Sequence, residues 1–173
     1  MTASMTGIVV ATTMPREAMH VVALVGAERI AFRVADVEEV MDAPALLAAP
    51  NAPEGLVGQF VHRDRTVRAF DAAFAFGIPD ARPRGAMLVV RVADDRIGLL
   101  VDDVEELAAL DAAAVRPTPP GVDPGGLLRG VCLPRAGGAR GDETSGALIC
   151  LVNAVALVAR LTSLGRGERA GAS

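Results

Sequence analysis

The sequence contains an internal repeat, and this repeat limits the folds that the chain can adopt. Residues 28–40 read Glu-Arg-Ile-Ala-Phe-Arg-Val-Ala-Asp-Val-Glu-Glu-Val, and residues 95–107, 67 positions further on, read Asp-Arg-Ile-Gly-Leu-Leu-Val-Asp-Asp-Val-Glu-Glu-Leu. Seven of the thirteen positions are identical, and three more are exchanges of similar side chains. The repeat therefore predicts two copies of one small unit, packed so that a groove or paired faces remain where other proteins can dock.

An all-β fold is predicted, because both copies carry a β-hairpin at the same place, over residues 20–34 and 87–101. Each hairpin has an apolar run, a polar turn and then alternating apolar residues, such as Ile97, Leu99 and Val101. Further strands are predicted over residues 56–62, 66–70, 127–133 and 147–152. The Val-Glu-Glu segments after the hairpins fit either a strand or a helix. Their glutamates fit either a solvated edge that discourages sheet pairing or a functional face.

Short helices are predicted after Asp71 and Asn153, whose side-chain oxygens can accept hydrogen bonds from the first free N–H groups of a helix. Gly77 and Gly165 stand where these helices would end. We interpret Asp71 and Asn153 as structural caps and not as catalytic groups. Residues 79–85, 116–126 and 134–146 are predicted loops, and residues 1–17 and 166–173 are predicted to be disordered.

Composition excludes several classes of partner. The net charge is −4, and the acidic runs after the hairpins would repel a phosphate backbone, so no nucleic acid is expected as a partner. Apolar residues make up 51% of the chain, but the longest uncharged apolar run, residues 146–159, is too short to span a bilayer. We expect a cytoplasmic protein without direct membrane insertion. Cys132 and Cys150 lie in apolar strand-like runs and are interpreted as small buried hydrophobic residues.

The sequence offers little chemistry for an enzyme. It has two histidines, and a small hydrolase that uses His62 with Asp64 and the distant Cys132 is a remote alternative without a local signature. No spacing suited to zinc and no phosphate-binding glycine loop is present in the sequence. The sequence therefore predicts no catalysis, no metal and no cofactor.

Four blocks of residues resemble the CheW-like family of bacterial chemotaxis coupling proteins, and they spread over about residues 18–161. These blocks are Val37–Val40 after a hairpin; Pro50–Pro53 followed by Val57, Gly58 and Arg63; Gly98–Leu107; and Pro117–Pro120 before Leu128–Val131. The resemblance implies two small five-stranded β-barrel lobes within a domain at 18–161, with repeats at about 20–77 and 87–161 and the possibility of strand exchange between the lobes.

The resemblance also implies a non-catalytic adaptor. Its partners would be the cytoplasmic tip of methyl-accepting chemoreceptors and the regulatory domain of a CheA-type histidine kinase, which would associate the protein with receptor arrays. By motif position, the receptor groove would include Val37, Glu39, Gly58, Arg63, Val101 and Val104. Arg63 has a structural alternative, an ion pair with the Glu39 segment.

Four positions depart from the family pattern, namely Asp64, Arg68, Ala72 and Asn153. Asp64 lies between two arginines, so we expect it to hold Arg63 in an ion pair and to adopt a positive φ at some strain. These departures favour, as an alternative, a CheW-like scaffold of another kinase pathway, one that controls surface motility, biofilm formation or development.

Overall fold

The strands lie where the repeat predicts them. The computed structural model describes residues 19–79, 85–123, 125–133 and 148–167. The predicted disordered segment 1–17 and the loop 134–146 lie outside these residues. The strands are β1 (Met19–Val25), β2 (Glu28–Arg33), β3 (Val37–Asp42), β4 (Leu56–His62), β5 (Arg65–Asp71), β6 (Ala86–Val92), β7 (Asp95–Val101), β8 (Asp103–Ala109), β9 (Val115–Arg116), β10 (Leu128–Cys132) and β11 (Ile149–Val152). The Val-Glu-Glu segments thus form strands, β3 and β8.

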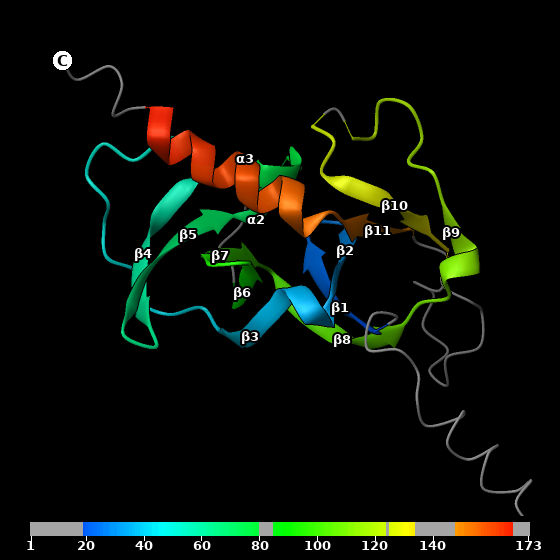
Figure 1. Ribbon diagram of the computed structural model, residues 1–173, viewed down its shortest axis with the longest axis horizontal. Coiled ribbons are helices and arrows are strands. Elements are labelled where there is room, and N and C mark those ends of the chain that lie inside the picture. The colour runs from blue at the N-terminus through cyan, green and yellow to red at the C-terminus, as the bar shows by residue number, and fades with distance from the viewer. Residues whose placement is uncertain (1–18, 80–84, 124, 134–147, 168–173) are drawn as a thin grey trace, which may run out of the picture.

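The strands form two sheets (Figure 1), one with the order β8-β1-β2-β11-β10-β9 and one with the order β3-β6-β7-β5-β4. The prediction of five strands per lobe is wrong for the first sheet, because Val115 and Arg116 of the short β9 pair with β10. In the described part of the chain, no backbone pairing joins the two outermost strands of either sheet. The closed barrels are therefore not confirmed.

Each sheet is assembled from both repeats. The first repeat places its hairpin, β1 and β2, in the six-stranded sheet, but its next strand, β3, pairs with β6 in the five-stranded sheet. The second repeat does the reverse, because β8 pairs with β1. The two exchanges are equivalent: Val37 lies opposite Val90, and Val104 lies opposite Ala23, each 67 positions apart in the two repeats.

Alternation along the strands produces three apolar clusters. Successive side chains of a strand point to opposite faces, so one face of each hairpin enters a central cluster shared by the two sheets. Phe32 and Leu99, equivalent residues of the repeat, are both buried there. The opposite faces enter two smaller clusters, one beneath each sheet, where Val22 and Met87 are examples. Burial of each large side chain contributes about 1.5–3 kcal/mol, so the central cluster holds the repeats together.

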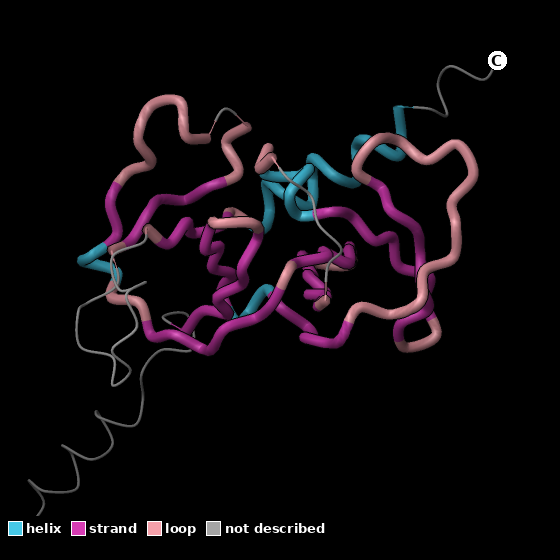
Figure 2. The backbone as a smooth tube through the Cα atoms, turned by 180° about the vertical axis from the view of Figure 1, so that it is seen from behind, coloured by secondary structure: helices cyan, strands magenta, loops and turns pink. Residues whose placement is uncertain are grey.

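Two helices follow the repeats, α2 (Ala72–Phe76) and α3 (Ala154–Gly167). The carboxylate of Asp71 accepts from the N–H of Ala73 at 2.9 Å, and Gly77, with a φ of 67°, ends α2. The side chain of Asn153 accepts from the N–H of Ala156 at 3.2 Å. The helix α3 packs on β6 and β7 and lies across the junction of the two sheets (Figure 2).

The end of α3 differs from the sequence prediction. The helix continues past Gly165 to Gly167, so the first two residues of the predicted tail 166–173 are helical, and the others lie outside the described residues. Leu157, Val158 and Leu161 are buried in the central cluster. Packing of this apolar face is a stronger determinant of helix length than one glycine, which costs only about 1 kcal/mol.

Because neither repeat contains a complete sheet, we predict that neither folds alone. Residues 1–79 carry two strands of the six-stranded sheet and three of the five-stranded sheet, and residues 80–173 carry the remainder. Each fragment alone should lack a cooperative denaturant transition, whereas an equimolar mixture should regain the strand signal in circular dichroism. A single fragment that unfolds cooperatively would contradict this prediction.

Candidate functional site

Side chains connect the two outermost strands of the five-stranded sheet, β3 and β4, where the backbone does not. His62 Nε2 at the end of β4 lies 2.5 Å from Glu39 Oε2 of β3. Arg63 in the following turn donates from Nη1 to Glu38 Oε1 at 3.2 Å. Arg96 of β7 donates from Nε to Glu38 Oε2 at 2.5 Å. We call these five residues, Glu38, Glu39, His62, Arg63 and Arg96, the edge bridge.

A β-bulge and a tight turn position the edge bridge. The register of β3 against β6 shifts between Val37 and Glu39, which re-aims the side chains of a strand. The β4–β5 turn places Arg63 and Asp64 at φ values of 48° and 62°. Positive φ at both central residues is the geometry of a two-residue hairpin turn that matches the twist of the strands. The turn therefore presents His62 and Arg63 side by side to β3.

Glu38 is the most enclosed carboxylate of the edge bridge, with a side chain that is 9% exposed. The hydrogen bond from Arg96 is the main reason that the pKa of Glu38 lies below its ordinary value, and the positive charges of Arg96 and Arg63 contribute further. A carboxylate enclosed to this degree is tolerated when its charge is paired and its oxygens accept hydrogen bonds. We therefore assign Glu38 a structural role and not a role in binding.

His62 and Glu39 are exposed to different degrees. The imidazole of His62 is 5% exposed and packs edge-on against the ring of Phe60, with 6.4 Å between centroids. Its Nδ1 has no hydrogen-bond partner among the described residues. The side chain of Glu39 is 39% exposed. An ionised carboxylate can only accept, so His62 donates to Glu39 through a protonated Nε2. The carboxylate of Glu39 is therefore fixed by a hydrogen bond to a buried side chain, while the rest of it is accessible to solvent.

The second repeat reproduces part of the edge bridge. Arg29 and Glu105 stand 67 positions from Arg96 and Glu38, and they also form an ion pair, with Arg29 Nε 3.2 Å from Glu105 Oε2. In each pair, the arginine of one repeat meets the glutamate of the other. Sequence reasoning did not find these arginines, although both are identical positions in the repeat. The repeat itself contained the signal, because a strand exchange between the two copies brings the arginine of one copy next to the glutamate of the other.

The predicted groove residues separate into different environments. Val37 and Val104 are half-buried against the central cluster, and Glu39 and Arg63 belong to the edge bridge. Val101 is completely buried in the central cluster, so it cannot contact a partner and supports the surface from below. Gly58 is buried as well.

Gly58 has a packing role that its motif position did not reveal. A Cβ at this position would lie 2.7 Å from the carbonyl oxygen of Leu47, which bridges to β4 opposite Gln59. Gly130 of the second repeat is similar, because a Cβ there would lie 2.6 Å from the carbonyl oxygen of Arg116. Both glycines let a neighbouring segment approach the strand closely.

The four departures from the family pattern have structural settings. The ion pair of Arg63 is with Glu38, which confirms the alternative of an ion pair with the Glu39 segment and corrects the expected pair with Asp64. Asp64 is exposed at its positive φ. Arg68 lies 5.9 Å from the ring centroid of Phe70, Ala72 is fully buried, and Asn153 caps α3.

An apolar surface lies beside the edge bridge. Val57 and Val61 are 49% and 66% exposed and, four residues apart on β4, they share one face. Leu47, which is 63% exposed, bridges to β4 between them. We call Leu47, Val57 and Val61 the β4 patch. Exposed apolar residues gathered on an edge strand are typical of a protein contact.

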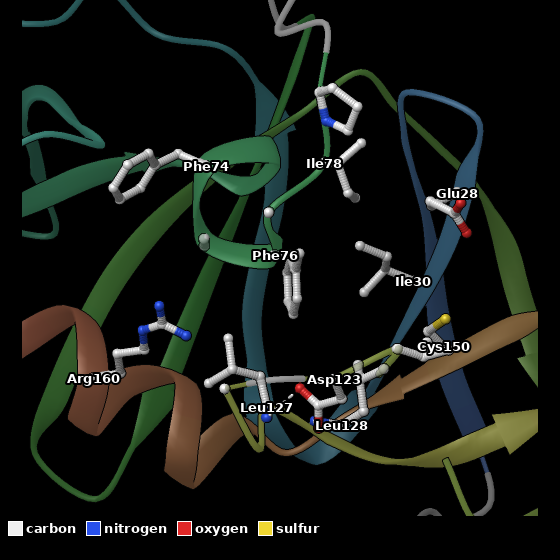
Figure 3. Close-up of a pocket in the computed structure, with 15 residues that line it drawn as sticks. Glu28, Ile30, Phe74, Phe76, Ile78, Asp123, Leu127, Leu128, Cys150 and Arg160 are labelled. Atoms are coloured by element: carbon white, nitrogen blue, oxygen red, sulfur yellow. Dashed lines mark hydrogen bonds between the residues drawn. The ribbon is translucent and has the colours of Figure 1, made fainter. Parts of the chain in front are cut away.

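A cavity of about 320 Å³ lies on the helix side of the molecule, between α2, α3 and residues 122–123 and 125–128. In Figure 3, Phe76 and Ile30 point into its middle, while Arg160 and Cys150 lie on opposite sides. Both carboxylate oxygens of Asp123 accept backbone N–H groups at 2.8 Å, which commits this acid to the loop. Burial raises the pKa of the Cys150 thiol, which leaves it a poor nucleophile.

The constellation required by the hydrolase alternative is not assembled. His62 belongs to the five-stranded sheet, and Cys132, whose pKa is raised by burial, belongs to β10 of the six-stranded sheet. Within residues 19–79, 85–123, 125–133 and 148–167, no three His, Cys, Asp or Glu side chains are placed to hold a metal ion. Over the same described ranges, no helix has the length and apolar character needed to cross a membrane.

Comparison with known proteins gives the family and the fold. The family model of the CheW-like domain matches residues 20–161. The crystal structure of the scaffolding protein TtCheW from Thermoanaerobacter tengcongensis superposes with a TM-score of 0.64 at 22% sequence identity, covering 78% of this chain and 88% of that chain. At this identity, the likeness concerns the fold alone. The comparison with curated proteins found no match.

Replacement of Gly58 by Ala should destabilise the protein, because the added Cβ meets the Leu47 carbonyl oxygen. We expect the free energy of unfolding to fall by about 1–3 kcal/mol in urea denaturation. Gly130→Ala, which tests the equivalent approach in the other sheet, should show a similar loss. If Gly58→Ala were fully stable but bound partners less well, Gly58 would be a contact residue and the packing role would be wrong.

Acid should weaken the fold through Glu38. Because its folded-state pKa is lowered, Glu38 stabilises the protein above its ordinary value of 4.5, and this contribution is lost as the pH falls through the folded-state value. Urea denaturation over a pH series should therefore show a smaller acid-induced loss in Glu38→Gln than in the parent. Glu54→Gln, at an exposed position, is the matched control and should behave like the parent. Identical pH profiles for Glu38→Gln and the parent would contradict the assignment.

Proposed function

Because the chain belongs to the CheW-like domain family, whose members are non-catalytic scaffolds, we propose that it couples methyl-accepting chemoreceptors to a CheA-type histidine kinase. The match spans residues 20–161 and is the observation that carries the proposal. In this proposal, the protein works by binding two partners at separate surfaces, in a two-component pathway at cytoplasmic receptor arrays.

We assign the receptor surface to Glu39, with Val37 and Val104 as its apolar floor. The charge and partial exposure of Glu39 support this assignment, since 39% of its side chain is accessible. Val37 and Val104 are both half-buried at equivalent positions of the repeat. A helical receptor tip can place spaced apolar side chains against such a floor and a basic side chain against Glu39.

The kinase regulatory domain is assigned to the β4 patch. Val57 and Val61 lie on the outward face of an outermost strand, and the exposed Leu47 bridges to that strand. On the side away from β5, this strand pairs with the described residues only at Gln59, which exchanges two backbone hydrogen bonds with Leu47, and a partner domain can pack against the rest of the strand. Two surfaces with different chemistry, one acidic and one apolar, suit an adaptor that holds two partners at once.

A second candidate function is a CheW-like scaffold in a related kinase pathway that controls surface motility, biofilm formation or development. Asp64 supports it, because this exposed carboxylate lies in the turn next to Arg63 of the edge bridge. A negative charge at this place would repel some receptors and so narrow the choice of partner.

Glu39→Gln is the sharpest test of the receptor surface. The amide keeps an oxygen that can accept from His62 but removes the charge, so the melting temperature should stay close to that of the parent. Binding of a chemoreceptor tip fragment, measured by titration calorimetry, should weaken about threefold to tenfold. Glu106→Gln, 67 positions further on, is the matched control and should bind like the parent. Unchanged affinity of Glu39→Gln would remove Glu39 from the receptor surface.

Val61→Asp serves as the reciprocal control. A charge in the β4 patch should weaken binding of the kinase regulatory domain and leave receptor binding intact. If Val61→Asp and Glu39→Gln each weakened both partners, the two surfaces would not be separate.

A further inference from the structure

His62 occupies an unusual position for a titratable group. Only 5% of its side chain is exposed, yet its one polar contact within the described residues is Glu39, which faces the surface. The chain has two histidines, His20 and His62. Histidine is the side chain that ordinarily changes charge between about pH 5 and pH 8. A proton taken up by His62 therefore changes the charge directly behind the proposed receptor surface.

The charged groups around His62 determine how a proton on its ring changes the net charge of the edge bridge. Glu39 and Glu38 of β3 lie near it, and Arg65 lies opposite it on β5. Arg63 follows it in the turn, and Arg63 and Arg96 of β7 both pair with Glu38. With a neutral imidazole, the two glutamates and the two arginines of the edge bridge cancel. With a protonated imidazole, the edge bridge carries a charge of +1, and Arg65 adds to the positive field.

The proton also changes the bond between the two side chains. When His62 is neutral, Nε2 donates to a carboxylate that keeps its full negative charge. When His62 is protonated, the same contact becomes an ion pair that is shielded by burial, in which the charge of Glu39 is compensated from within. Glu38 cannot replace it at the surface, because both of its oxygens already accept from arginines.

We propose that His62 is a positioning residue that makes receptor binding pH-dependent, by leaving the charge of Glu39 available to a basic side chain of the receptor when neutral and neutralising it when protonated. This inference rests on the proposed function, because it concerns the receptor surface. Affinity for the receptor falls as the medium becomes acidic.

Titration calorimetry with a chemoreceptor tip fragment at about pH 8 and about pH 6, at constant ionic strength, tests the inference. The parent should bind about threefold to tenfold more weakly at the lower pH. His62→Gln retains an N–H that can donate to Glu39 but does not titrate, so its affinity should be nearly the same at both values. His20→Gln removes the other histidine and should keep the pH dependence of the parent.

The outcomes separate the inference from the proposed function. If the parent binds the fragment at neither pH, the proposed function fails. If the parent binds equally well at both, or if His62→Gln keeps the full pH dependence, the function stands and the inference is overturned.

A second measurement does not depend on the folding of His62→Gln. Binding of the same fragment by Glu39→Gln at the two pH values should show little pH dependence, because the charge that a proton on His62 would neutralise is gone. A pH dependence as large as that of the parent would also overturn the inference.

Discussion

The pairing of β3 with the second hairpin and of β8 with the first is the constraint on which the remaining structure depends. Each repeat supplies a hairpin to one sheet and its later strands to the other, so the two sheets form only together. The central cluster fills between them because the same faces of both hairpins, with Phe32 and Leu99 at equivalent positions, point toward the shared interior. The exchange also moves Glu38 and Glu39 away from their own hairpin and sets them at the edge of the opposite sheet.

The edge of the five-stranded sheet is closed by side chains, and this determines the character of the candidate site. An outermost strand with unpaired N–H and C=O groups attracts other chains, and charged residues are a common protection against that. Here, Glu38 and Glu39 of β3 have different roles. Glu38 is enclosed and paired with two arginines, whereas Glu39 is held by His62 and remains partly exposed. The sequence was compatible with a solvated edge or with a functional face. In the structure, the two glutamates of β3 combine both roles, because Glu38 pairs with arginines at the edge of the sheet and Glu39 keeps its charge partly exposed to solvent.

The sequence predicted the local features of the fold well and the long-range contacts poorly. Hairpins, caps and the end of α2 follow from alternation, from Asp71 and Asn153, and from Gly77, all of which act over a few residues. The ion pair of Glu38 with Arg96 joins residues 58 positions apart, and only the strand exchange brings them together. Alternation alone could have corrected one error, since Val101 lies in phase with Ile97 and Leu99 and therefore on the buried face. Motif position had placed it in the groove.

The repeat makes the two sheets similar, but it does not make their edges equivalent. The bulges at Gly58 in β4 and Gly130 in β10 align the two strands, and this alignment sets Val61 against Leu133, both of which are exposed. The residue aligned with His62 is then Pro134, which has neither a titratable group nor a backbone N–H to donate. In our proposal, a proton on His62 therefore alters the edge of the five-stranded sheet, and the sequence offers no titratable group at the aligned position. An adaptor must distinguish its partners although it is built from two copies of one unit, and a single histidine at one edge is enough to make the two faces chemically unlike.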